Sequence, residues 1–137
     1  QNLTEKEGVL FYPEGTRYTP SELNQVRNKL SQGSSDHLVD SMKRLKHVLP
    51  PKLGGTLTLV RSAPEADVVF MATYGLDAVT TFGDLINGGL VDHPLRVHCW
   101  RVPRSEIPKD ETAQEKWLLG EWEKMDQVVG ELKAKSE

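Results

Sequence analysis

The residue types best suited to chemistry stand together near the start of the chain, in Glu14-Gly15-Thr16-Arg17, after a short apolar run closed by Pro13. Arg17 offers a planar fork of donors that fits a phosphate in two parallel hydrogen bonds, and Thr16 adds a hydroxyl. Gly15 lets a ligand approach the backbone closely. The residues therefore predict a corner that holds a phosphate monoester. The alternative is that Glu14 and Arg17 pair with each other across a surface turn.

Other reactive side chains carry weaker signals. Cys99 follows His98 directly, but neighbours along a strand point to opposite faces, so His98 would not activate the thiol. We interpret Cys99 as a buried structural thiol in a reducing compartment. His37 and Asp40 would share a helix face, a commonplace spacing that favours no catalytic role. No Cys/His spacing typical of zinc appears, so no metal is predicted.

Three apolar runs are predicted to be the strands that position this corner. They cover residues 8–12, 66–74 and 94–102. The first run is almost unbroken, as in a strand buried on both faces of a mostly parallel sheet, the second is also predicted to be a buried strand, and the third alternates in part. Pro13 cannot donate to a ladder, so the first strand ends before it. If residues 8–12 form a strand, the corner at 14–17 lies at its carboxyl end, where open α/β sheets bind ligands.

Helices are predicted between and after these strands. Thr19-Pro20-Ser21-Glu22 has the pattern of a capping box and starts the first helix, and Pro50-Pro51 stops the second. Residues 56–63 are interpreted as a short helix, although periodicity alone also allows a strand. The last helix has a predicted cap at Thr112-x-x-Glu115. Apolar residues keep helical spacing in the first helix (Leu23, Val26, Leu30), the second (Leu38, Met42, Leu45, Leu49) and the last (Leu118, Trp122, Met125, Val129, Leu132).

Composition bounds the fold class and the partners. At 137 residues, with 37% hydrophobic and 27% charged residues, the chain is predicted to form one α/β domain. No apolar run approaches the length of a membrane span, and residues 1–8 lack the features of a signal peptide. The net charge is −3, yet residues 27–61 carry seven basic and two acidic residues. That block is a candidate face for phosphates or anionic lipid, or a solvated helix surface; no nucleic-acid-reading motif accompanies it.

Beyond the residue chemistry, three stretches resemble a known family. "FYPEGTR" at 11–17 is similar to the F-P-E-G-T-R signature of glycerolipid acyltransferases related to 1-acyl-glycerol-3-phosphate acyltransferase. "LKHVLPPKLGG" at 45–55 and "IPKDETAQEKWLLGEWEKMD" at 107–126 resemble later stretches of one branch. The resemblance implies a glycerol-3-phosphate acyltransferase-like fold, a mostly parallel sheet flanked by helices with a long C-terminal helix.

The resemblance also implies a function. Members transfer an acyl group from acyl-CoA or an acyl carrier protein to a lysophospholipid, with no further cofactor. Glu14, Gly15, Thr16 and Arg17 would form the acceptor-phosphate site. Lys52 stands where the branch has an arginine, which keeps the charge but loses the fork, and is a candidate contact to acceptor or CoA phosphate. The implied setting is the cytoplasmic face of a membrane, bound peripherally, with this chain itself soluble.

The match departs from the family at its catalytic base. Members use the His of an H-x-x-x-x-D motif, and no histidine here is followed five residues later by aspartate. We therefore expect residues 1–137 to be the C-terminal portion of an acyltransferase domain, partnered by an upstream half and inactive in isolation. The competing hypothesis is a non-catalytic module that binds phospholipid or protein.

Overall fold

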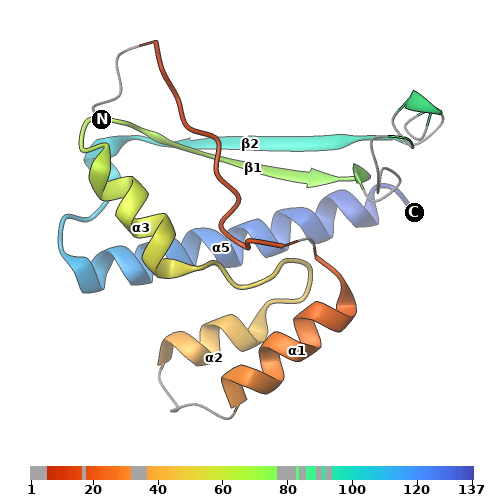
Figure 1. Ribbon diagram of the computed structural model, residues 1–137, viewed down its shortest axis with the longest axis horizontal. Helices are drawn as coiled ribbons and strands as arrows, with labels where there is room; N and C mark the ends of the chain where they lie inside the picture. The colour runs from red at the N-terminus through yellow and green to blue at the C-terminus, as the bar shows by residue number, and fades with distance from the viewer. Residues whose placement is uncertain are drawn as a thin grey trace.

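In a computed structural model, a small sheet packs against one long helix, and a layer of shorter helices lies on the other side of that helix (Figure 1). The structure describes residues 6–16, 18–31, 37–76, 83, 86–88, 91 and 94–137. Two strands lie against α5 (Glu111–Ala134), and α3 (Leu53–Ser62) crosses one end of them. α1 (Pro20–Ser31) and α2 (His37–Arg44) lie on the far side of α5 from the strands. The mixed helix and strand content predicted from the sequence is confirmed.

The sheet is antiparallel, so the prediction of a mostly parallel sheet is wrong. β1 (Val68–Tyr74) pairs with β2 (Arg96–Val102) in a two-stranded sheet, with Phe70 opposite Trp100 and Met71 opposite Cys99. The predicted positions of the strands at 66–74 and 94–102 are confirmed, but the apolar run at 66–74 suggested a buried strand. Only one face packs against α5, while on the other face Val69, Met71 and Val97 are at least half exposed.

The run at 8–12 is not a strand. Residues 7–12 form an extended segment that passes across the strands in Figure 1 without joining the described sheet. Its apolar side chains from Val9 to Tyr12 are exposed. An apolar run becomes a buried strand only where a neighbouring strand accepts its backbone hydrogen bonds, and the described residues provide none here.

α5 supplies the centre of the core, as its apolar stripe predicted. Leu118, Trp122 and Met125 are buried against Phe70 and Val102 of the sheet, and Val129 and Leu132 pack partly buried beside them. The cap differs from the prediction: Asp110 caps the helix by accepting a hydrogen bond from the Ala113 amide at 2.9 Å. Aspartate at that position also places a negative charge at the positive end of the helix dipole.

The helical layer begins as the capping pattern predicted. The Thr19 hydroxyl accepts a hydrogen bond from the Glu22 amide at 3.0 Å, and α1 starts at Pro20. α2 is shorter than predicted, because it ends at Arg44 and does not reach Pro50-Pro51. The amides of residues 46–48 all donate to one carboxylate oxygen of Asp126, so they cannot continue the helical ladder. α5 thereby fixes the loop that follows α2.

The interpretation of residues 56–63 as a helix is confirmed by α3, which begins earlier, at Leu53. The predicted link at 79–88 lies mostly outside the described residues. Across the helices that the structure describes, none is both long enough and apolar enough to span a bilayer.

Candidate functional site

The corner at 13–16 is joined to the loop at 49–52 by two hydrogen bonds. The Lys52 amide donates to the Pro13 carbonyl at 2.9 Å, and the Leu49 amide donates to the Glu14 carboxylate. Within the corner, the Gly15 amide donates to the Tyr12 carbonyl at 3.2 Å and closes a tight turn. Two sequence segments some 35 residues apart therefore form one structural unit.

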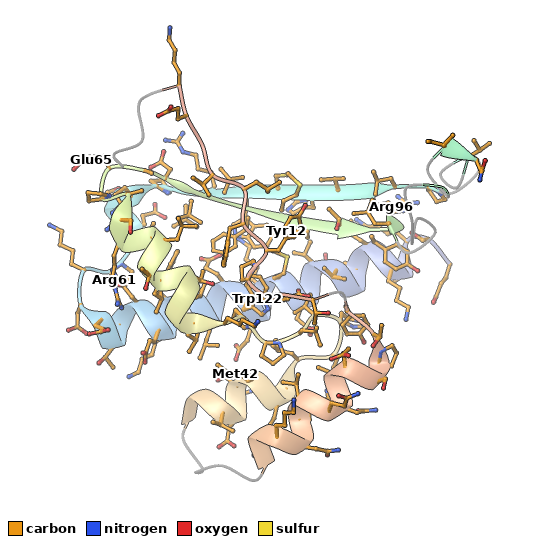
Figure 2. The ribbon with its side chains drawn as sticks, viewed as in Figure 1. Tyr12, Met42, Arg61, Glu65, Arg96 and Trp122 are labelled. Carbon is orange, nitrogen blue, oxygen red and sulfur yellow. The ribbon has the colours of Figure 1, made fainter. Side chains whose placement is uncertain are left out.

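A pocket of about 320 Å³ lies at this junction. Its polar lining comes from Glu14, Gly15, Thr16 and Lys52, and its apolar lining from α1, α2 and the loop before α3. The apolar members are Val26, Met42, Leu49, Pro50 and Pro51 (Figure 2, where Met42 is labelled). Small-molecule sites in proteins have volumes of about 300–1,000 Å³ and combine apolar walls with a few polar groups. The pocket is thus suited to a small amphiphile or a headgroup.

Glu14 is the titratable group whose environment is most unusual here. Burial raises the pKa of its carboxyl from 4.5 to about 7, against the smaller, opposite effect of the Leu49 amide that donates to it. Near neutral pH the protonated form of this carboxyl is therefore far more populated than in an ordinary glutamate. A protonated carboxyl can donate a hydrogen bond to an anion, whereas the carboxylate would repel it.

Lys52 supplies the pocket's positive charge. Its side chain lies against the α-carbon of Gly15, so a β-carbon at that residue would come within 2.6 Å of the Lys52 Nζ. Gly15 also has φ of +73°, a left-handed conformation in which L-residues with a β-carbon are strained. Both observations explain glycine at this position. Within the described residues, no ion pair joins Lys52 to Glu14, so the ammonium is not neutralised by its neighbour.

The structure brings together four of the five predicted site residues: Glu14, Gly15, Thr16 and Lys52. Arg17, the predicted phosphate fork, lies outside the described residues, and its role stays a prediction. The sequence reasoning missed the apolar floor. Val26, Met42 and Leu49 had been assigned to the buried stripes of two helices, and no sequence signal separates a pocket wall from a core stripe.

The remaining candidates do not assemble into a site. Cys99 is exposed, so its interpretation as a buried thiol is wrong, because it lies on the sheet face that α5 does not cover. His98 lies opposite Ala72 and Cys99 opposite Met71, on alternating faces as expected. The His37 side chain lies outside the described part of the chain. Among the described residues, no group of three His, Cys, Asp or Glu side chains could hold a metal ion.

Comparison with known proteins gives one informative match. The chain is 24% identical over 134 residues to a protein from Caenorhabditis elegans named lysophosphatidylinositol acyltransferase 10. The alignment covers 94% of this chain and 32% of that protein, so the chain spans about a third of its relative's length. No protein-family model matches, and no solved structure matches significantly. The match supports a relationship between this chain and acyltransferases, a class of transferases.

Proposed function

We propose that this chain is the acceptor-binding portion of a lysophospholipid acyltransferase and holds the acceptor's phosphate at the junction of residues 13–16 and 49–52. The observation that carries the proposal is the pocket itself. The Lys52 ammonium lies against the turn at Gly15, above an apolar floor. The named relative, which acts on a lysophosphatidylinositol, supports a lipid acceptor of this class.

The pocket's two halves match the two halves of such an acceptor. Lys52 and the Thr16 hydroxyl would bind the phosphate, while Met42 and Leu49 would contact the glycerol and the start of the acyl chain. A lysine binds phosphate as a point charge and leaves the headgroup free to rotate, so Arg17 would set its orientation with bidentate hydrogen bonds. These groups bind and orient the acceptor. They do not remove a proton from its hydroxyl.

Binding to the chain tests the proposal directly. We suggest titrating the isotopically labelled chain with a short-chain, monomeric lysophosphatidate and following backbone amides by NMR. The Gly15 and Thr16 amides should shift, and Lys52→Ala should weaken binding by about tenfold or more, since a hydrogen bond to a charged group contributes about 1.5–3 kcal/mol. Lys109→Ala is the matched control, because Lys109 is exposed and distant in sequence from the pocket.

Two results would contradict the phosphate role. One is equal binding of the matching monoacylglycerol, which lacks the phosphate. The other is unchanged affinity in Lys52→Ala together with unchanged affinity in Arg17→Ala.

The second candidate function is a non-catalytic phospholipid-binding module, favoured by the lack of an H-x-x-x-x-D sequence in these 137 residues. For the chain alone we predict no acyl transfer from acyl-CoA to lysophosphatidate. Measurable turnover by the purified chain would show that a base is present among its own residues. If a longer protein containing this chain supplies an H-x-x-x-x-D motif and turns over, the module hypothesis fails.

A further inference from the structure

A second hollow lies on the helical layer and is lined by cations alone. It has a volume of about 620 Å³, and its lining residues are Arg27 of α1, Lys43 and Arg44 of α2, and Lys46 of the following loop. We call it the basic hollow. None of the described residues that line it is acidic. The positive charge is local, because the whole chain carries a net charge of −3.

The two arginines of the basic hollow are held in place by the protein. An Arg27 guanidinium nitrogen donates to the Leu45 carbonyl at 2.5 Å and links α1 to the end of α2. Arg44 forms an ion pair with Glu123 of α5 at 3.0 Å and also donates to the Ser41 hydroxyl. These contacts fix the walls of the basic hollow.

The side chains of the two lysines make no contacts of this kind. Among the described residues, neither the Lys43 nor the Lys46 ammonium has a hydrogen-bond or ion-pair partner, including Asp40 on the same helix. The backbone at Lys46 is nevertheless anchored, because its amide donates to Asp126 and its carbonyl accepts from the Tyr18 hydroxyl at 2.8 Å. The ammonium groups of the half-buried Lys43 on α2 and the exposed Lys46 on its anchored loop thus lie beside two guanidinium groups that the protein holds in place.

The basic hollow and the candidate acceptor pocket are lined by the same two helices. Arg27 follows Val26 on α1 and Lys43 follows Met42 on α2, and both of these apolar residues line the pocket. We propose that the basic hollow binds phosphate groups of anionic lipids at a membrane surface. A wide, open surface with cations on flexible stems suits a layer of headgroups, and the neighbouring apolar pocket suits a lipid more than a soluble phosphate.

This inference adds a membrane contact to the proposed function and does not depend on the acceptor role of Lys52. The test uses the purified 137-residue chain and vesicles that contain no lysophospholipid. We expect sedimentation with vesicles of phosphatidylcholine and phosphatidylserine, little binding to phosphatidylcholine alone, and loss of binding in high salt, which shortens the screening length.

Variants locate the contact. Each basic residue at an anionic surface contributes about 1 kcal/mol, or about fivefold in partitioning, so Lys43→Ala with Lys46→Ala should lower binding about 30-fold. The control pair is Lys109→Ala with Lys116→Ala, two exposed lysines outside the basic hollow, with little expected effect. Equal losses in both pairs would overturn the assignment of the site.

Further experiments distinguish lipid phosphates from the phosphates of soluble molecules and nucleic acids. Pyrophosphate or a short RNA that binds through Lys43 and Lys46 while vesicles do not sediment the chain would overturn the lipid assignment. Lys52→Ala separates the two proposals, because it should retain vesicle binding even where it abolishes lysophosphatidate binding. Vesicle binding lost in Lys52→Ala but kept in the Lys43 and Lys46 double variant would place the membrane contact at the acceptor pocket instead.

Discussion

Replacing Glu14 by glutamine should make the protein more stable at alkaline pH and leave it unchanged in acid. Burial raises the pKa of this carboxyl from 4.5 to about 7, so the folded state binds its proton more tightly than the unfolded state. Below about pH 4.5 both states are protonated and the ionisation has no effect. As pH rises to about 7 the wild-type chain loses stability, and above that the loss is complete.

The size of the effect follows from the pKa difference. One pKa unit corresponds to 1.36 kcal/mol, so the ionised Glu14 destabilises the fold by at most about 3 kcal/mol. Residual solvent contact reduces this, and about 1–3 kcal/mol is the expected gain for Glu14→Gln at pH 8. The glutamine carbonyl can still accept the hydrogen bond from the Leu49 amide, which limits other changes.

Urea denaturation at pH 4.5, 6 and 8 measures the difference in unfolding free energy between variant and wild type. Subtracting the wild-type curve removes the titration of all other groups. Glu65→Gln is the matched control, because Glu65 is exposed in a turn and its substitution should give no pH-dependent gain (Figure 2). A difference that is the same at all three pH values, or a gain at pH 4.5, would refute the assignment of a buried, destabilised carboxylate.

Three further predictions test the packing around the site and the sheet. Gly15→Ala should destabilise the fold by about 1–2 kcal/mol, because φ is +73° and the β-carbon would displace Lys52. Its control is Gly120→Ala, in an open helix position, which should stabilise the fold by up to about 1 kcal/mol. Urea denaturation measures both changes in unfolding free energy, and destabilisation of similar size in both variants would contradict the assignment of strain to Gly15. Trp122→Phe should cost about 1–3 kcal/mol in the same assay, since it leaves the Leu49 carbonyl without the buried 2.7 Å hydrogen bond from the indole; a cost below about 0.5 kcal/mol would contradict it. Cys99 should react completely with a thiol reagent such as dithionitrobenzoate in the folded chain, and a thiol that reacts only after denaturation would contradict its exposure.

The local elements could be read from the sequence because their signals are local. The Thr19 cap and the stripe of Leu118, Trp122 and Met125 depend on residues within a few positions of one another. The groups at residues 14–17 that could bind a phosphate and the positive charge of Lys52 likewise belong to the residue types themselves. Those properties would hold in any fold that exposes the corner.

Contacts between distant segments required the tertiary structure. Strand direction depends on which segments pair, and an apolar run such as 68–74 reads the same in a parallel and an antiparallel sheet. The end of α2 was set by Asp126, about 80 residues away, and the pocket by hydrogen bonds from the loop at 49–52 to residues 13 and 14. The pKa of Glu14 likewise depends on what covers it. The sequence determined which groups could bind a phosphate, and packing decided which of them share a pocket, because burial and pairing are properties of the folded chain as a whole.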